Sequence, residues 1–92
     1  MLDKTKARFQ EDDKNKAIVK KVFYSPYIEL RDVLKEFPEN EIEIYQTLLE
    51  QLIKDLILIE LTTQAGSNIE SRVPKRLLIV NPEIENDLES IL

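Results

Sequence analysis

Carboxylates and hydroxyls are the side chains of this sequence that could carry out chemistry, because the chain has no histidine and no cysteine. Pairs of carboxylates could bind Mg²⁺ or Ca²⁺, but no segment has the loop spacing of a dedicated site. The serines of the chain are Ser25, Ser67, Ser71 and Ser90. No histidine is present to activate any of them as a nucleophile. One glycine, Gly66, is too few for a phosphate-cradling loop. The sequence therefore predicts a protein that is not an enzyme, with no catalytic residue, metal site or cofactor.

Acidic side chains are concentrated in one apolar segment of a chain whose net charge is −5. Between Pro38 and Leu56 there are five acids and a single base, Lys54. On a helix, the face opposite the apolar stripe would carry Glu43, Thr47, Glu50 and Lys54, flanked by Gln46 and Gln51. We interpret these four residues as candidate contacts for a protein partner of basic character. The alternative interpretation is an ordinary solvated face with a well-charged first turn.

Two basic clusters could contact nucleic acid. One comprises Arg72, Lys75 and Arg76, and the other comprises Lys14, Lys16, Lys20 and Lys21. Phosphate neutralisation normally supplies most of the affinity for DNA, so the nucleic-acid-binding candidates are Arg72, Lys75, Arg76, Lys20 and Lys21. The alternative is that lysines on an exposed strand block aggregation at a sheet edge. No aromatic residue is interleaved with either cluster, so stacking on single strands has little support.

Helical apolar periodicity predicts three helices in the first part of the chain. The first spans Asp13–Tyr24 and ends before Pro26. The second begins near residues 27–29 and ends at Phe37, before a second proline. The third spans Glu41–Lys54, with an apolar stripe formed by Ile42, Tyr45, Leu49, Leu52 and Leu56. Asn40 and Glu43 have the spacing of a capping box at its start.

A period-2 pattern then predicts two strands joined by a polar turn. The first strand covers Ile57–Thr63 and the second covers Arg72–Val80, with Gly66 in the turn. Asn81 and Pro82 are typical of a helix start, and the last helix carries an apolar stripe of Ile84, Leu88 and Ile91. This stripe is either a homodimer contact or a surface that folds back onto the domain.

The remaining predictions concern the ends and the environment of the chain. We expect residues 1–12 to be a mobile tail or a frayed helical extension, and residues 13–92 to form one domain. No apolar run approaches the roughly 18 residues that a membrane helix needs. The N-terminus lacks the apolar stretch of a secretory signal. The sequence therefore predicts a cytoplasmic protein without a membrane segment.

The order of three helices, a strand, a turn, a strand and a helix resembles the winged helix-turn-helix superfamily. The local resemblance lies in Ile44-Tyr45-Gln46-Thr47-Leu48-Leu49 and Leu52-Ile53-Lys54-Asp55-Leu56-Ile57, which are similar to the recognition helix and wing of small bacterial regulators. It covers residues 14–80, is topological, and departs from the usual glycine at Asp55. The resemblance implies an α+β winged-helix domain with a three-helix core, a two-stranded wing and a short C-terminal helix.

Two functions follow from combining this resemblance with the charges. The first hypothesis is a non-enzymatic module that binds a protein partner through the third helix. The alternative is a regulator that binds duplex DNA through the basic wing, as a dimer, because the acidic third helix would oppose phosphate contacts.

Overall fold

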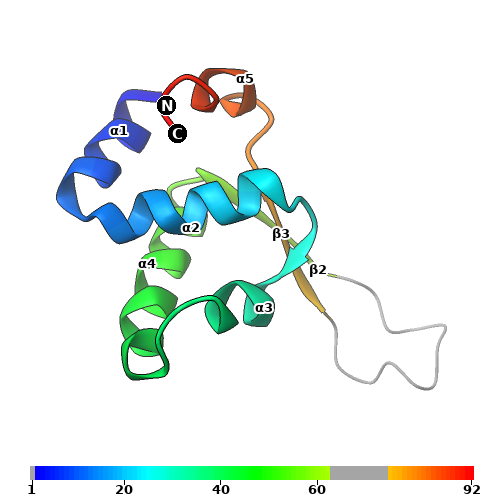
Figure 1. Cartoon of the computed structure of the whole chain (residues 1–92). Coiled ribbons are helices and arrows are strands. Elements are labelled where there is room, and N and C mark those ends of the chain that lie inside the picture. The colour runs from blue at the N-terminus through cyan, green and yellow to red at the C-terminus, as the bar shows by residue number, and fades with distance from the viewer. Residues whose placement is uncertain (1, 63–74) are drawn as a thin grey trace, which may run out of the picture.

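The computed structural model describes residues 2–62 and 75–92, and it is an α+β domain in which helices lie against one antiparallel sheet (Figure 1). The elements follow the order α1 (Leu2–Glu11), α2 (Asp13–Tyr24), β1 (Ile28–Glu29), α3 (Leu30–Lys35), a 3-10 turn (Glu39–Glu41), α4 (Ile42–Lys54), β2 (Leu58–Thr62), β3 (Arg76–Val80) and α5 (Glu85–Leu88). The expected polar turn at Gly66 and the start of the second strand at Arg72 lie outside the described residues.

Helix α2 has the bounds that its sequence predicts. The Asp12 side chain caps it by accepting a hydrogen bond from the Lys14 amide at 3.0 Å, as N-cap carboxylates commonly do. Its buried residues include Ile18, Val19 and Val22, which lie on one helical face. The helix therefore presents a single apolar face to the core and leaves its lysines at the periphery.

The chain leaves α2 through a tight turn and enters a strand that the sequence analysis missed. The Ile28 amide donates to the Ser25 carbonyl at 3.2 Å, and Tyr27 has a φ of 66°. Proline followed by a residue with positive φ has the form of a type II turn. Ile28–Glu29 then pairs with β3. The prediction of a helix from residues 27–29 to Phe37 is corrected accordingly, because α3 spans only Leu30–Lys35.

Helix α4 begins one residue later than predicted and without the expected capping box. Asn40 lies inside the 3-10 turn, and the N-cap of α4 is Glu41, which makes no side-chain cap hydrogen bond. The Glu41 amide donates to the Pro38 carbonyl at 2.9 Å. A 3-10 turn of this kind satisfies amides that a side-chain cap would otherwise bind.

The sheet has three antiparallel strands in the order β1-β3-β2, so the predicted two-stranded ribbon is extended by one strand. Partners across β2 and β3 share a face. Leu58 pairs with Val80, and both are buried towards the helices. On the other face, Ile59 pairs with Ile79 and Leu61 pairs with Leu77.

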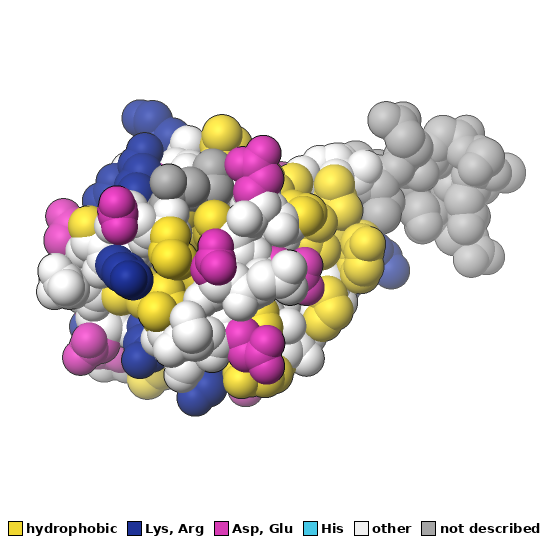
Figure 2. All heavy atoms as spheres, turned by 90° about the horizontal axis from the view of Figure 1, so that it is seen from above, with side chains coloured by type: hydrophobic (Ala, Val, Ile, Leu, Met, Phe, Trp, Pro, Cys, Tyr) yellow, Lys and Arg dark blue, Asp and Glu magenta, His cyan; other side chains and the backbone are white. Residues whose placement is uncertain are grey.

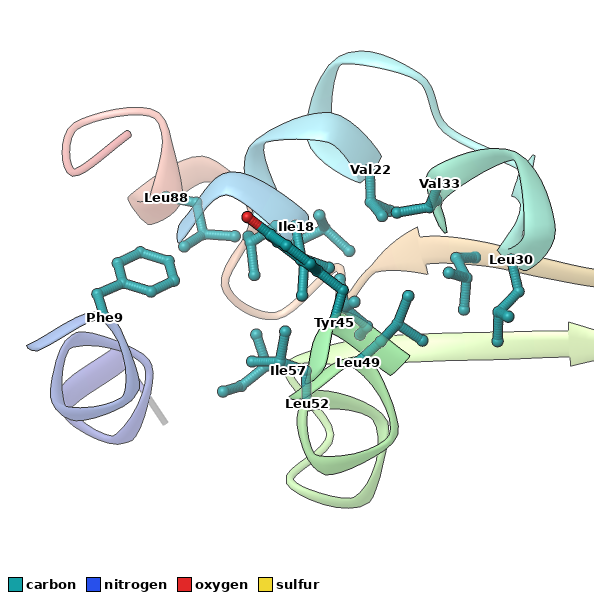
Figure 3. Packing of buried hydrophobic residues seen from close by; sticks show 14 of the residues in the cluster. Phe9, Ile18, Val22, Leu30, Val33, Tyr45, Leu49, Leu52, Ile57 and Leu88 are labelled. Carbon is teal, nitrogen blue, oxygen red and sulfur yellow. The ribbon is translucent and has the colours of Figure 1, made fainter. Parts of the chain in front are cut away.

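The core lies between α2, α4 and the sheet (Figure 3). Leu49 and Leu52 are fully buried on α4, whereas Ile44 on the same helix is 49% exposed. The rings of Phe37 and Tyr45 stack with centroids 3.8 Å apart, which joins the segment after α3 to α4. Helix α4 therefore contacts α2, α3 and β2.

The segment expected as a tail or frayed extension forms helix α1, which packs against α2. Phe9 of α1 points towards Leu88 of α5 (Figure 3), and both belong to the core cluster. The Asn15 side chain donates to the Arg8 carbonyl at 2.8 Å and fixes the corner between α1 and α2. The packed core therefore extends beyond the expected start at Asp13.

The α4–β2 corner adopts a left-handed conformation at a leucine. Leu56 has a φ of 63° and is 54% exposed. The Ile57 amide donates to the Leu52 carbonyl and the Leu56 amide to the Ile53 carbonyl, both at 3.0 Å, which is the Schellman pattern. Glycine is favoured at this position because a Cβ clashes there. The residue in the glycine position is therefore Leu56, one after Asp55. Its predicted place in the apolar stripe of the third helix is wrong, because Leu56 lies beyond the end of α4 and is exposed.

Replacing Leu56 with glycine should raise the free energy of unfolding by about 0.5–1 kcal/mol. The change removes the cost of a left-handed residue with a Cβ, which is about 1–2 kcal/mol. Part of this gain is lost, because glycine has a larger conformational entropy in the unfolded chain. Urea unfolding of both proteins measures the difference. Leu61→Gly, an exposed leucine in the regular strand β2, is the control and should be destabilising. A less stable Leu56→Gly protein would contradict the strain at this corner.

Candidate functional site

The outward face of α4 is the surface that carries the predicted partner-binding residues. Its side chains line one open depression, which is formed by Glu43, Gln46, Thr47, Glu50, Gln51 and Lys54. The Thr47 hydroxyl donates to the Glu43 carbonyl one turn earlier at 2.9 Å. All four predicted contacts therefore lie together on one polar, exposed helix face, and the depression is open rather than enclosed.

Arg76 connects this face to the sheet. Its Nε donates to Glu60 Oε1 at 2.5 Å, and its Nη2 donates to Glu60 Oε2 at 2.9 Å. The same Nη2 reaches Glu50 Oε1 on α4 at 3.0 Å. Hydrogen bonding to Arg76 lowers the pKa of Glu60 against the opposing effect of burial, and the two carboxylates raise the pKa of Arg76. One guanidinium therefore holds β2, β3 and α4 together.

Asp55, at the C-terminal end of α4, is paired with two cations of α1. Its carboxylate accepts from Arg8 Nε at 2.6 Å and lies 3.4 Å from Lys4 Nζ. Burial raises the pKa of Asp55, but the hydrogen bonds and charges of Arg8 and Lys4 outweigh this and leave the pKa lowered. This pairing was not predicted, because residues 1–12 were expected to be a mobile tail or a frayed helical extension.

These ion pairs change the charge of the α4 surface. Glu50 and Asp55 are neutralised by Arg76 and by α1. No ion pair forms within residues 2–62 and 75–92 at the remaining acids of the segment, which are Glu39, Glu41 and Glu43. The excess negative charge is therefore confined to the N-terminal end of α4, and the rest of its outward face is polar and close to neutral.

The predicted nucleic-acid contacts are mostly occupied by carboxylates. Besides Arg76, Lys75 lies 3.5 Å from Glu29 and Lys21 lies 3.0 Å from Glu36. Lys20 is exposed and lies on α2, whereas Arg76 begins β3 and Lys75 directly precedes it. Arg72 falls outside the described residues. Three of the four described candidates are therefore paired with carboxylates, and Lys20 forms no ion pair within residues 2–62 and 75–92.

The predicted dimer contacts belong to the core of the chain itself. Ile84 and Leu88 are buried, and Ile91 packs against the same cluster. The Asn81 side chain accepts from the Glu83 amide and donates to the Leu56 carbonyl, so it fixes the turn before α5 rather than capping a helix at Pro82. Folding back, the alternative for this stripe, is the arrangement observed.

The aromatic pair at the end of α2, Tyr24 and Tyr27, flanks the break at Ser25-Pro26 and is a further candidate contact patch in the sequence. The alternative interpretation is that these tyrosines only close the end of a helix pair. Tyr24 is 65% exposed and Tyr27 is 60% exposed. Hydrophobic side chains gather towards the right-hand end of the molecule in Figure 2, and the turn after α2 lies at that end in Figure 1. Both tyrosines are therefore exposed rather than buried at the end of a helix pair.

Comparisons with protein-family models, with curated proteins and with solved structures gave no match to this chain. Among the described residues, no helix has the length and apolar character to cross a membrane. Within the same residues, no group of three or more carboxylates is placed to hold a metal ion.

Proposed function

We propose that this chain is a non-enzymatic winged-helix module that binds a protein partner through the outward face of α4. The single observation that carries the proposal is the depression lined by Glu43, Gln46, Thr47, Glu50, Gln51 and Lys54. Helices α2, α3 and α4, followed by the antiparallel strands β2 and β3 and by helix α5, support the winged-helix assignment. Fold resemblance by itself does not define function, so the proposal depends on this surface.

The chemistry of the face favours a protein over duplex DNA. Amide, hydroxyl and charged side chains alternate there, and they can exchange hydrogen bonds with a polar partner surface. The acids at the N-terminal end of α4 would repel phosphates, and three described basic candidates already pair with carboxylates. A partner with basic side chains opposite Glu43 and amides opposite Gln46 and Gln51 fits this distribution of charge.

The proposal predicts that charge reversal on α4 removes partner binding while the fold is retained. Glu43→Lys is the cleanest change, because Glu43 is exposed and forms no ion pair within the described residues. Proteins retained from a lysate of the source cells by immobilised wild-type chain would be compared with those retained by the variant. We expect loss of at least about tenfold in the signal of a specific partner, as for removal of a central contact.

Glu85→Lys on α5 is the matched control, since it makes the same charge change at another exposed helix position. If the Glu43→Lys variant retained the same partner, or if Glu85→Lys reduced partner binding equally, the proposal that the α4 face binds the partner would be contradicted. The DNA-binding alternative has its own measurement: duplex affinity that falls steeply between roughly 50 and 200 mM salt would support it. Undetectable duplex binding at the lower salt concentration would exclude it.

A further inference from the structure

Tyr27 occupies a strained backbone position without burying its side chain. Its φ of 66° lies in the left-handed region, which costs a residue with a Cβ about 1–2 kcal/mol. Glycine is the usual residue at this position of a type II turn. Since the ring is 60% exposed, core packing does not explain why a tyrosine stands here. Strain of this kind at an exposed side chain points to a role in binding.

The surrounding contacts hold Tyr27 and Tyr24 in fixed places. The Tyr27 amide donates to the Leu78 carbonyl of β3 at 2.9 Å, and the Ser25 amide donates to the Val22 carbonyl at 3.2 Å. The Tyr24 ring meets Phe23 edge-on, with centroids 5.1 Å apart and an interplanar angle of 82°. The two rings are thus presented from a rigid turn rather than from a long loop, which lowers the entropic cost of binding.

Two lysines continue this surface along α2. Lys16, Lys20 and Tyr24 are spaced four residues apart, so their side chains follow one another on the same face about every 6 Å. Both lysines are exposed. Neither forms an ion pair within the described part of the chain, whereas Lys14 and Lys21 on the same helix do. Asp13 is the acid on this face, and it lies at the end remote from the tyrosines.

We propose that this surface, formed by Lys16, Lys20, Tyr24 and Tyr27, binds single-stranded nucleic acid. The two unpaired ammonium groups complement the phosphates, and the exposed rings stack on unpaired bases, which is the combination that non-specific single-strand binding uses. This revises the interpretation from the sequence that stacking has little support, because Tyr24 follows Lys20 by one turn on the same helix. The buried base pairs of a duplex offer no face to these rings. The inference goes beyond the protein-partner proposal, because the ligand, the helix and the side chains all differ from those of the α4 face.

Tyr27→Gly tests the proposal sharply, because it should stabilise the turn and weaken binding at the same time. Fluorescence anisotropy with a labelled oligothymidylate about 20 nucleotides long measures the affinity, and urea unfolding measures stability. We expect affinity to fall about 5- to 150-fold on loss of one stacked base, with stability unchanged or higher. Tyr27→Phe retains the ring and should keep the wild-type affinity.

The lysines are tested by salt dependence. Lys16→Gln/Lys20→Gln should reduce the slope of log affinity against log salt by about 1.4, the value for two contacts on a single strand. Lys6→Gln on α1, another exposed lysine with no ion pair within the described residues, is the control and should leave the slope unchanged. Glu43→Lys, which tests partner binding by the α4 face, should not weaken oligonucleotide binding. A failure of the α4 proposal can therefore be distinguished from a failure of the single-strand proposal.

Three results would overturn the proposal. The first is no oligonucleotide binding by the wild-type chain at roughly 50 mM salt, where phosphate contacts are strong. The second is unchanged affinity in a folded Tyr27→Gly protein. The third is full displacement of the oligonucleotide by polyphosphate at equal charge concentration, since polyphosphate has no bases to stack and would identify a purely electrostatic anion surface.

Discussion

Replacing Leu49 with alanine should lower the free energy of unfolding by about 2–5 kcal/mol. Leu49 is fully buried on α4, and its side chain lies in the core cluster beside Leu52 (Figure 3). The cost combines the lost burial with the cavity that remains, because surrounding side chains relax only partly. Domains of this size are stable by only about 5–15 kcal/mol, so a large fraction of the stability should disappear.

Ile44→Ala on the same helix is the control for Leu49→Ala. Ile44 is 49% exposed, so the change keeps the helix and removes little buried area. Urea unfolding followed by circular dichroism compares the two variants with the wild type. A loss at Ile44 as large as at Leu49 would show that α4 buries a different face from the one described.

Replacing Arg76 with alanine should destabilise the domain by about 1–2 kcal/mol at neutral pH. This value is that of hydrogen bonds to a charged group, lowered because solvent partly screens the Arg76 ion pairs. The change leaves Glu60 without its guanidinium and separates Glu50 from the sheet. Lys35→Ala, which removes an exposed pair with Asp32 on α3, is the control and should change stability by less than about 0.5 kcal/mol.

The effect of Arg76→Ala should depend on pH in a defined direction. The pKa of Glu60 is lowered in the folded chain by Arg76. A lowered carboxyl pKa contributes stability that is present above the unfolded value and is lost as pH falls through the folded value. The difference between wild type and Arg76→Ala should therefore be full at pH 7 and shrink below the ordinary glutamate pKa of about 4.3. A difference that stays constant down to acid pH would exclude this ion pair as its source.

Local patterns predicted the parts of the fold that are determined by nearby residues. The bounds of α2, the buried face of α4 and the pairing of β2 with β3 followed from apolar periodicity and turn residues. The outward face of α4 was predicted as well, since it is the complement of its buried stripe. The binding of a protein partner and the winged-helix assignment remain predictions.

Contacts between distant residues account for what the sequence analysis missed. Strand β1 has two residues, Ile28–Glu29, and exists because β3 supplies its hydrogen-bond partners. Helix α1 has one buried aromatic, Phe9, and its position depends on the pairing of Arg8 with Asp55, 47 residues later. This pairing of Asp55, together with that of Glu50 with Arg76, neutralised carboxylates that had been counted as a free acidic surface. Periodicity contains no information on such long-range partners.

The meeting of Phe9 and Leu88 in one core has a consequence for biosynthesis. Segment α5 leaves the ribosome after every other described element, yet it supplies Leu88 and Ile84 to the cluster that α1 enters. The nascent chain can form α2 and α4 early, but the hydrophobic surface of α1 has no complete counterpart until translation has passed residue 88. The domain can therefore close only after α5 has left the ribosome, and the nascent chain carries an uncovered apolar site until then.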